Sequence, residues 1–227
     1  MIQNDISGLV HALAKAHSVA VLTGAGVSAE SGVPTFREAQ TGLWEQYDPL
    51  QLATPEAFTA DPGLVWRWYQ FRRDLILRVE PNPGHRALAD LEGLVPDFAL
   101  VTQNVDGLHE RAGSTGVIEF HGNLFVDLCS REGTTVSGCS GREPPICPDC
   151  GAPVRPGVVW FGEAIPESCL ENAYNAARNC DVFLSIGTSS LVYPAAGLVD
   201  LARDAGAVLV EINPEPTAIA DRVDFAL

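Results

Sequence analysis

Apolar and polar residues follow two alternating periodicities along the chain, and these predict the order of its elements. Short runs of consecutive apolar residues are typical of parallel strands that are buried on both faces of a sheet. Runs of this kind predict strands at Ser18–Thr23, Phe98–Thr102, Val117–Phe120, Val158–Glu163, Val182–Ile186 and Val208–Ile212.

Helical spacing of apolar residues fills most of the intervals between these runs. It predicts helices at Ile6–Ala14, from Thr54 onward, at Pro62–Ile76, Arg86–Leu91, Pro166–Asn179 and Ala195–Ala205. Thr54-Pro55 and Asp61-Pro62 each combine an N-cap residue with a proline at the first helical position. Strands that alternate with helices predict an α/β fold, a doubly wound parallel sheet of the Rossmann-like kind.

Two segments of different character interrupt this pattern. The chain of 227 residues suits one large domain with small inserts. We expect a Rossmann-like part at about 1–35, 95–122 and 158–227, a small helical insert at about 36–94, and a small Cys-containing, zinc-ribbon-like module at about 123–157.

The first predicted strand runs directly into Gly24-Ala25-Gly26. Glycines let the backbone approach a pyrophosphate, and the N-terminus of a following helix supplies free N–H groups. The acidic residue that an ordinary dinucleotide fold carries about 20 residues later is missing. By itself the motif therefore also fits a tight strand-to-helix turn without a ligand.

Polar residues follow other predicted strands, and strand ends of an open α/β sheet face its ligand crevice. Gln103, Asn104 and Asp106 follow the second strand and could bind a carboxamide or a ribose, and Gly187-Thr188-Ser189 follow a later one. His121 comes directly after the third strand, where it could act as a general base. A single histidine is, however, more often structural.

Tyr69 and Arg72 are three residues apart and therefore share one face of a predicted helix. A phenol and a guanidinium together make a good receptor for a carboxylate. A surface arginine beside a packing tyrosine is the alternative interpretation.

Cysteines gather in the predicted small module. Cys147-Pro148-Asp149-Cys150 has the spacing that lets two thiolates reach one tetrahedral zinc ion. Cys129 precedes it, but Glu132 occupies the place of the second cysteine of an upstream pair. We expect Zn²⁺ on Cys129, Cys139, Cys147 and Cys150; a Glu132 oxygen as ligand, or a loop without zinc, are the alternatives.

Composition narrows the class of protein. A formal net charge of -15 argues against a general nucleic-acid binder, which would carry a basic face, and we expect no sequence-specific nucleic-acid partner. No apolar run reaches the roughly 18 residues of a membrane span, and the N-terminus lacks the apolar core of a signal peptide. We therefore expect a cytoplasmic monomer that does not enter a membrane.

Several motifs occur together in order along nearly the whole chain. They are Gly24–Arg37, Thr102–Asp106, His121-Gly122, Cys147-x-x-Cys150, Phe161–Glu163, Gly187–Ser189 and Ile212-Asn213. Together they resemble the sirtuins, which are NAD-dependent protein-lysine deacylases. The spacing of Tyr69 and Arg72 looks like that of the class III group, in which this pair binds the acidic end of succinyl- or malonyl-lysine.

The resemblance implies roles for individual residues. His121, Asn104 and Asp106 would be catalytic, Gly24, Ala25 and Gly26 would hold the pyrophosphate of NAD, and Gln103 would line the nicotinamide pocket with Asn104 and Asp106. The remaining expected NAD contacts are Glu30, Pro34, Phe36, Arg37, Gly187, Thr188, Ser189, Asn213, Pro214 and Glu215. The acyl-lysine segment of another protein would lie on Val159, Phe161, Gly162, Glu163 and Tyr193, with its acyl group at Tyr69 and Arg72.

The resemblance also implies the chemistry. The acyl oxygen attacks the ribose carbon as nicotinamide leaves, and His121 acts as base on the ribose hydroxyls, which then attack the bound acyl carbon. Water finally releases free lysine and O-acyl-ADP-ribose. Because the chain ends at Leu227, before the family's last glycine-containing strand end, we expect one contact to the adenine end of NAD to be missing. The alternatives are a mono-ADP-ribosyltransferase at the same site, a hydride-transferring dehydrogenase and a non-catalytic NAD-binding module.

Overall fold

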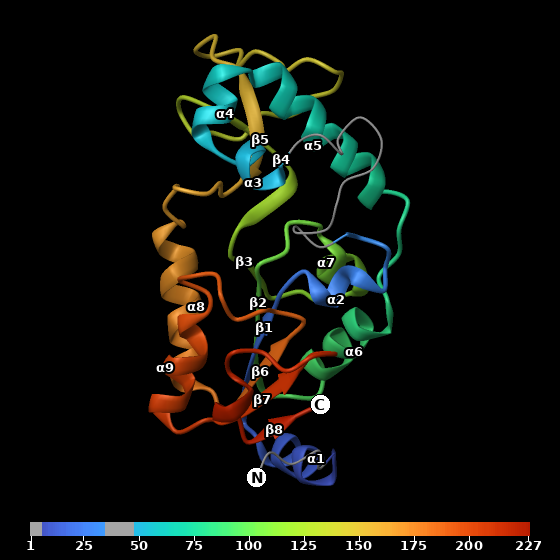
Figure 1. Cartoon of the computed structure of the whole chain (residues 1–227), viewed down its shortest axis with the longest axis vertical. Coiled ribbons are helices and arrows are strands. Elements are labelled where there is room, and N and C mark those ends of the chain that lie inside the picture. The colour runs from blue at the N-terminus through green and yellow to red at the C-terminus, as the bar shows by residue number, and fades with distance from the viewer. Residues whose placement is uncertain (1–5, 35–47) are drawn as a thin grey trace.

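A computed structural model describes residues 6–34 and 48–227 of the chain (Figure 1). Its helices are α1 (Ile6–Lys15), α2 (Gly26–Ala29), α3 (Pro49–Leu52), α4 (Pro55–Ala60), α5 (Pro62–Ile76), α6 (Pro83–Glu92), α7 (Leu108–Ala112), α8 (Glu167–Asn179), α9 (Gly197–Ala205) and the 3-10 turn η2 (Ala220–Arg222). Its strands are β1 (Ser18–Thr23), β2 (Asp97–Thr102), β3 (Val117–Glu119), β4 (Gly122–Cys129), β5 (Val154–Val158), β6 (Val182–Ile186), β7 (Val208–Ile212) and β8 (Phe225–Ala226).

The larger sheet is six-stranded, with the order β3-β2-β1-β6-β7-β8, and each of its neighbouring pairs is parallel. Helices α8 and α9 cover one face, and α1 and α6 cover the other (Figure 1). The predicted doubly wound α/β fold is therefore confirmed. The strand order reverses direction at β1, which places the ends of β1, β2 and β6 beside one another.

The packing of strand β1 explains why its sequence is apolar from Val19 to Leu22. Its side chains alternate between two cores: Ala20 and Leu22 pack toward α8 and α9, whereas Val19 and Val21 pack toward α1 and α6. All six of its residues are buried. A strand that is covered on both faces has no position at which a polar residue would reach water.

The smaller part of the molecule is built from α3, α4 and α5 and the antiparallel pair β4 and β5 (Figure 1). Its core contains Phe58, Val65, Trp68, Tyr69, Leu124 and Trp160. Helix α6, which lies within the predicted helical insert, instead packs on α7 and β2 of the larger part.

One predicted strand is wrong in extent. The apolar run Val158–Glu163 predicted a strand, but β5 ends at Val158 and belongs to the small antiparallel sheet. Beyond it, Phe161 N donates to Ala53 O in the turn before α4, and Gly162 has a φ of +89°. This positive φ turns the backbone out of the extended conformation. Strand β4 escaped prediction because polar residues interrupt its apolar positions.

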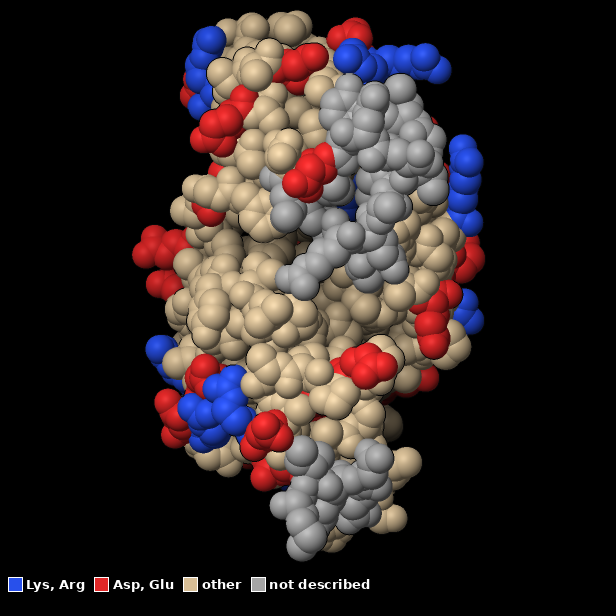
Figure 2. Space-filling view, in the orientation of Figure 1, with Lys and Arg blue, Asp and Glu red and all other residues tan. Residues whose placement is uncertain are grey.

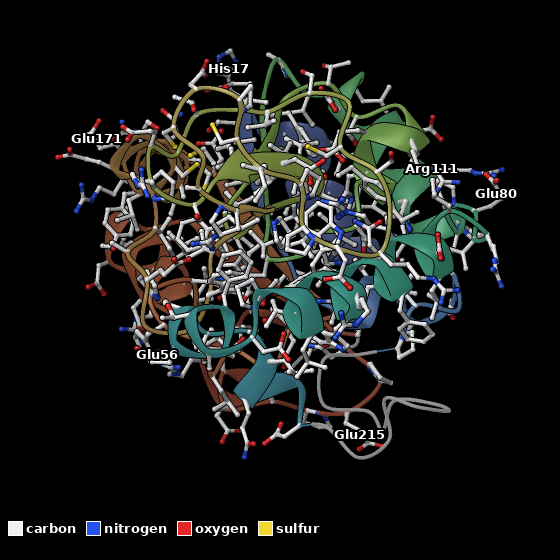
Figure 3. All side chains as sticks on the ribbon, turned by 90° about the horizontal axis from the view of Figure 1, so that it is seen from above. His17, Glu56, Glu80, Arg111, Glu171 and Glu215 are labelled. Carbon is white, nitrogen blue, oxygen red and sulfur yellow. The ribbon has the colours of Figure 1, made fainter. Side chains whose placement is uncertain are left out.

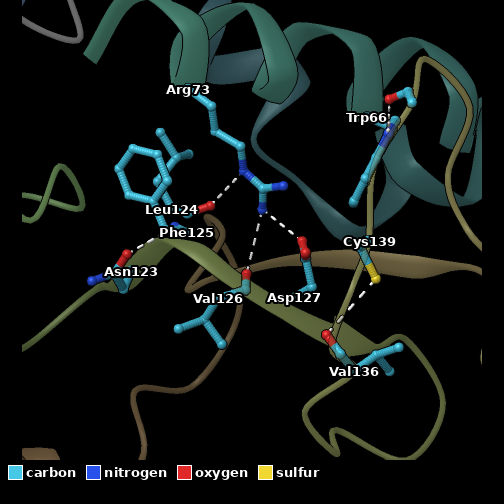
Figure 4. Close-up of polar contacts among 10 residues, drawn as sticks. Trp66, Arg73, Asn123, Leu124, Phe125, Val126, Asp127, Val136 and Cys139 are labelled. Carbon is cyan, nitrogen blue, oxygen red and sulfur yellow. Dashed lines mark hydrogen bonds and ion pairs between the residues drawn. The ribbon is translucent and has the colours of Figure 1, made fainter. Parts of the chain in front are cut away.

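A buried cation joins α5 to β4. Arg73 pairs with Asp127 at 2.6 Å, and its Nε donates to Leu124 O at 2.7 Å (Figure 4). The two side chains are only 9% and 11% exposed. Removing one partner of a buried pair leaves an uncompensated charge, typically at a cost of about 3–5 kcal/mol. The contact therefore fixes the helix that carries Tyr69 and Arg72.

Charged side chains are scattered over the face drawn in Figure 2, with acidic and basic groups interspersed and a hollow where the two parts meet. His17, Glu56, Glu80, Arg111 and Glu171 lie at the periphery of the view in Figure 3. Among the described residues, no helix combines the length and the apolar character that crossing a membrane would require.

Candidate active site

The glycine-containing segments that follow β1 and β6 are in direct contact. Gly24 N donates to Ile186 O at 3.1 Å, and Gly26 N donates to Gly187 O at 2.8 Å. A Cβ on Gly24 would lie 2.8 Å from Thr188 Cβ, and one on Gly26 would lie 2.7 Å from Gly187 O. Glycine is therefore required here by the packing of the chain itself, and the same bare backbone remains open to a ligand because Gly26 is exposed.

The segment after these glycines forms the four-residue helix α2, and Gly32 follows it with a φ of +86°. Glu30 and Pro34, both expected to contact NAD, are exposed at its end. Phe36 and Arg37 lie outside the described residues.

Ser28 of α2 connects the end of β1 to the end of β2. Its hydroxyl donates to Asp106 Oδ2 at 2.7 Å, and it accepts from Asn104 Nδ2 at 3.1 Å. Asn104 Nδ2 also reaches Gly24 O at 3.1 Å, and Asp106 Oδ1 accepts from Leu108 N at 3.0 Å. The structure thus brings together two predicted catalytic residues through a serine that sequence reasoning missed. Its position inside the glycine motif was the available signal.

Two buried histidines stand behind this network. His85 Nε2 lies 3.3 Å from the Ser28 hydroxyl, and His109 Nε2 lies 3.0 Å from Thr23 Oγ1. Their ring centroids are 4.8 Å apart. Burial lowers the pKa of both, that of His109 to about 3, with the neighbouring His85 adding to the effect on His109. Both rings are therefore neutral at pH 7.

A second polar network lies at the ends of β6 and β7. Gln103 Nε2 donates to Thr188 Oγ1 at 3.0 Å, and Asn213 Nδ2 donates to Thr188 O at 3.2 Å and to Glu211 Oε1 at 3.3 Å. Ser189, the residue after Thr188, is half-buried. Pro214 and Glu215 are exposed, and Glu215 lies at the edge of the view in Figure 3.

His121 lies at the junction of the two parts, between β3 and β4. Its Nδ1 is 3.1 Å from Gln103 O, and its carbonyl accepts from Val159 N at 2.8 Å. Gly122 has a φ of +78°, which turns the chain from one sheet into the other directly after the histidine. Burial lowers the pKa of His121 below its ordinary value, against the effect of the Gln103 carbonyl.

The segment Val159–Glu163, which is expected to bind the substrate, is fixed by hydrogen bonds to other parts of the chain. Val159 N and Phe161 N are both used in internal hydrogen bonds, and Glu163 N donates to Trp160 O at 3.0 Å. Burial would raise the pKa of Glu163, but hydrogen bonds from Arg155 and from Trp160 N hold it below its ordinary value. Phe161 is 46% exposed, Gly162 is open on its Cβ side, and Tyr193, on the loop before α9, is 73% exposed.

Tyr69 and Arg72 lie together on α5, as their spacing predicted. Arg72 Cζ is 5.8 Å from the Tyr69 ring centroid and 5.2 Å from that of Trp68. Burial raises the pKa of Tyr69 to about 12, although Arg72 opposes the shift. Burial also lowers the pKa of Arg72, against the attraction of Tyr69 and Asp106. Tyr69 is buried and Arg72 is half-buried, so Arg72 is not a fully exposed surface arginine.

Three of the expected metal ligands form one cluster. The Sγ atoms of Cys129, Cys147 and Cys150 lie within 4.8 Å of one another, and a hydrogen bond from Glu132 N lowers the pKa of the Cys129 thiol. Three thiols at this separation suit zinc. The structure does not bring Cys139, the fourth expected ligand, into this cluster: its Sγ lies 3.7 Å from Val136 O (Figure 4).

Comparison of the sequence with known proteins gives close relatives. The NAD-dependent protein deacylase 1 of Pseudomonas aeruginosa is 54% identical over 218 residues, which cover 92% of this chain and 87% of that protein. The NAD-dependent protein deacylase of Methylococcus capsulatus is 51% identical over 229 residues, covering 96% of this chain and 90% of that protein.

Solved structures with a similar fold belong to Sir2 proteins as well. A complex of a Sir2 homolog with NAD is similar with a TM-score of 0.93 at 43% identity, covering 100% of this chain and 89% of that chain. A Sir2 complex with a deacetylated p53 peptide and acetyl ADP-ribose gives a TM-score of 0.82 at 32% identity, covering 98% and 92%. A sequence model of the Sir2 family matches residues 24–194 of this chain. The chain therefore belongs to the Sir2 family, as its resemblance to the sirtuins predicted.

Proposed function

We propose that this chain is an NAD-dependent protein-lysine deacylase. It removes acyl groups from lysines of other proteins and releases nicotinamide and O-acyl-ADP-ribose. One relationship carries the proposal: Gln103 O anchors His121, while the next residues of the same strand end, Asn104 and Asp106, are fixed by Ser28. A base and a polar receptor therefore meet at one edge of the sheet. The similarity to Sir2 proteins that bind NAD and to named deacylases supports the same activity.

The residues present fit NAD. Gly24 and Gly26 let the end of β1 pack against Gly187 and Thr188, and Gly26 is exposed, so a ligand can approach its backbone. Gly24, Ala25 and Gly26 would hold the pyrophosphate, with Gly187, Thr188, Ser189 and Asn213 toward the nucleoside. Gln103, Asn104 and Asp106 would hold the nicotinamide. NAD, when bound, supplies the electrophilic ribose carbon and accepts the acyl group.

His121 is the proposed base. A carbonyl oxygen only accepts, so the contact with Gln103 O assigns the proton to Nδ1 and leaves the lone pair on Nε2. Its lowered pKa keeps the ring neutral at pH 7, which a base requires. General-base help of this kind contributes about 10²–10⁴ in rate.

The acyl-lysine would lie along Val159–Glu163 and beside Tyr193, with Phe161 and Tyr193 exposed to meet it. Because the internal hydrogen bonds above already use the N–H groups of Val159, Phe161 and Glu163, the carbonyl groups of this segment are its candidate contacts. For an acidic acyl group, Arg72 supplies the cation and Tyr69 a phenol that stays protonated at neutral pH. We therefore propose succinyl- and malonyl-lysine as substrates beside acetyl-lysine.

We further propose a structural zinc ion on the thiolates of Cys129, Cys147 and Cys150. The cluster ties the end of β4 to the loop before β5, since Cys129 is the last residue of β4. The ion would stabilise this module, and no step of the deacylation is assigned to it.

Incubation of the protein with NAD and acetyl-, malonyl- and succinyl-lysine peptides tests the proposal. Mass spectrometry should show loss of the acyl group and appearance of O-acyl-ADP-ribose. A gain of one ADP-ribosyl group on the peptide would instead indicate a transferase. Unchanged peptide and NAD would indicate a binding module and would contradict the proposal.

A further inference from the structure

The Tyr69 phenol is held by an indole from the substrate segment. Trp160 Nε1 donates to Tyr69 Oη at 2.9 Å, and the two side chains are 3% and 1% exposed. Trp160 lies between Val159 and Phe161, both proposed substrate contacts. The hydrogen bond therefore links the helix that carries the acyl receptor to the segment that binds the lysine backbone.

Trp160 is itself clamped in one orientation. The Arg155 guanidinium lies 3.4 Å from the centroid of its ring, and Phe58 packs on it with centroids 5.2 Å apart. Arg155 in turn donates to both carboxylate oxygens of Glu163, at 2.5 and 2.8 Å. Glu163 Oε2 also accepts from Trp160 N at 2.8 Å. A planar cation, its carboxylate partner and the backbone thus fix the ring that reaches Tyr69.

The direction of this hydrogen bond decides what Tyr69 can offer. An indole N–H only donates, whereas a phenol both donates and accepts. Trp160 therefore occupies an acceptor site of the Tyr69 oxygen and leaves the phenolic hydrogen for another partner. Burial, which raises the pKa of Tyr69 to about 12, keeps that hydrogen in place. The phenol is fixed as a donor beside the Arg72 cation, the arrangement that a carboxylate requires.

We propose that Trp160 is a positioning residue for the selection of acidic acyl groups, acting through Tyr69 and held in place by Arg155 and Glu163. The proposal rests on the proposed deacylase function. In this proposal the acyl receptor consists of Tyr69 and Arg72 on α5 together with Trp160 in the substrate segment. Tyr69 and Arg72 alone therefore do not determine the selectivity between acyl groups.

A cycle of variants tests this unit. Trp160→Phe, Tyr69→Phe and the double variant are compared by kcat/KM on succinyl- and acetyl-lysine peptides. We expect Trp160→Phe to lower the succinyl-to-acetyl ratio about five- to tenfold, the scale of one hydrogen bond. In the Tyr69→Phe background it should lower the ratio no further. Equal losses on both peptides, or an additive loss in the double variant, would overturn the proposal.

Trp66→Phe is the matched control. Trp66 is also buried, lies on α5 and donates its Nε1–H to Gly141 O at 3.1 Å, but Tyr69 is not its partner. Its variant should leave the ratio unchanged. If it lowers the ratio as Trp160→Phe does, general loosening of the core is the cause and the proposal fails. Arg155→Lys, which removes the planar guanidinium, should lower the ratio in the same direction even if Trp160→Phe folds poorly.

An NMR measurement separates this proposal from the function on which it rests. The chain has 4 tryptophans, and ¹⁵N labelling gives each indole N–H its own signal. The Trp160 signal, identified by its absence in Trp160→Phe, should shift in Tyr69→Phe. An unmoved signal overturns the proposal even in an active enzyme. A shifted signal in a protein that deacylates no peptide would refute the proposed function, and the acyl role with it, while the hydrogen bond stands.

Discussion

The Ser28 hydroxyl donates to Asp106 Oδ2 over 2.7 Å, although the two residues are 78 positions apart in the sequence. This bond joins the helix after β1 to the loop after β2 at the point where the strand order reverses. Asn104 donates to the same hydroxyl. One small side chain therefore helps to orient two of the three polar residues that we assign to the nicotinamide pocket, Asn104 and Asp106.

Ser28→Ala should weaken NAD cleavage. The change removes the donor to Asp106 and the acceptor for Asn104, and hydrogen bonds to charged groups contribute about 1.5–3 kcal/mol. We expect kcat/KM for NAD to fall roughly 10- to 100-fold, measured as nicotinamide release. Ser114→Ala is the control, because Ser114 is also buried but its hydroxyl has no partner among the described residues. Equal kinetics in both variants would contradict the role of Ser28.

His121→Ala should nearly abolish deacylation. Loss of the base removes about 10²–10⁴ in rate. The fold should be unaffected, because within the described part of the chain the His121 side chain makes one hydrogen bond, to Gln103 O, and one ring contact, to the neighbouring Phe120. Single-turnover assays with an acetyl-lysine peptide measure the rate, and thermal unfolding measures the fold. His11→Ala, an exposed change on α1, is the control. Turnover close to wild type in His121→Ala would refute its assignment as base.

Arg72→Met should affect desuccinylation far more than deacetylation. A charge-assisted pair in a half-buried site is typically worth a few kcal/mol, so the succinyl rate should drop by roughly two orders of magnitude. The acetyl group carries no carboxylate to lose. Arg67→Met, on the same helix but paired at 2.8 Å with the exposed Glu143, should change neither rate. Parallel losses on the two peptides would show that Arg72 does not select the acyl group.

Stability should fall on acidification because of His109. Its pKa is lowered from 6.5 in the unfolded chain to about 3 in the fold, by burial first and by His85 second. Well above pH 6.5, His109 is neutral in both the folded and the unfolded chain. Below pH 6.5 His109 binds a proton in the unfolded chain, whereas in the folded chain it stays neutral down to about pH 3. The free energy of unfolding therefore falls by up to about 1.4 kcal/mol per pH unit in this range.

Urea unfolding at pH 7, 6 and 5 measures this slope. His109→Gln keeps an amide that can reach Thr23 and should flatten the pH dependence, whereas His11→Gln should not. If His109→Gln and the wild type lose stability in parallel over this range, the buried neutral histidine is not the cause.

Metal removal should destabilise the small module. Purified protein should contain zinc at about one ion per chain, and chelation or Cys147→Ser should lower both the zinc content and Tm. Cys139→Ser is the informative control: its Sγ contacts Val136 O and lies outside the three-thiol cluster, so zinc content should stay unchanged. Loss of zinc in Cys139→Ser would restore it as a ligand.

Local sequence determined the elements and much of their order. Strands β1, β6 and β7 match their predicted bounds because each is a short, mostly apolar run whose central residues are buried. Thr54 and Asp61 cap α4 and α5 as predicted, since a side-chain oxygen three residues before a free N–H needs no distant partner. The sequence also predicted that the polar residues after the strands would gather, because the carboxyl ends of parallel strands lie at one edge of the sheet.

Only the tertiary structure decided which of these residues touch. The pairing of β1 with β2 and β6 brings Ser28 to Asp106, and the packing of α5 on the small sheet brings Tyr69 to Trp160. Cys139 lies outside the cluster that the other three thiols form, although its spacing alone suggested that it would join them, and its Sγ is near the carbonyl of Val136, three residues away. Such contacts depend on register and on the path of the chain between distant segments. Neither the register nor the chain path produces a periodic pattern in the sequence. The residue types therefore predict the kind of chemistry, whereas the tertiary structure determines which residues contact one another.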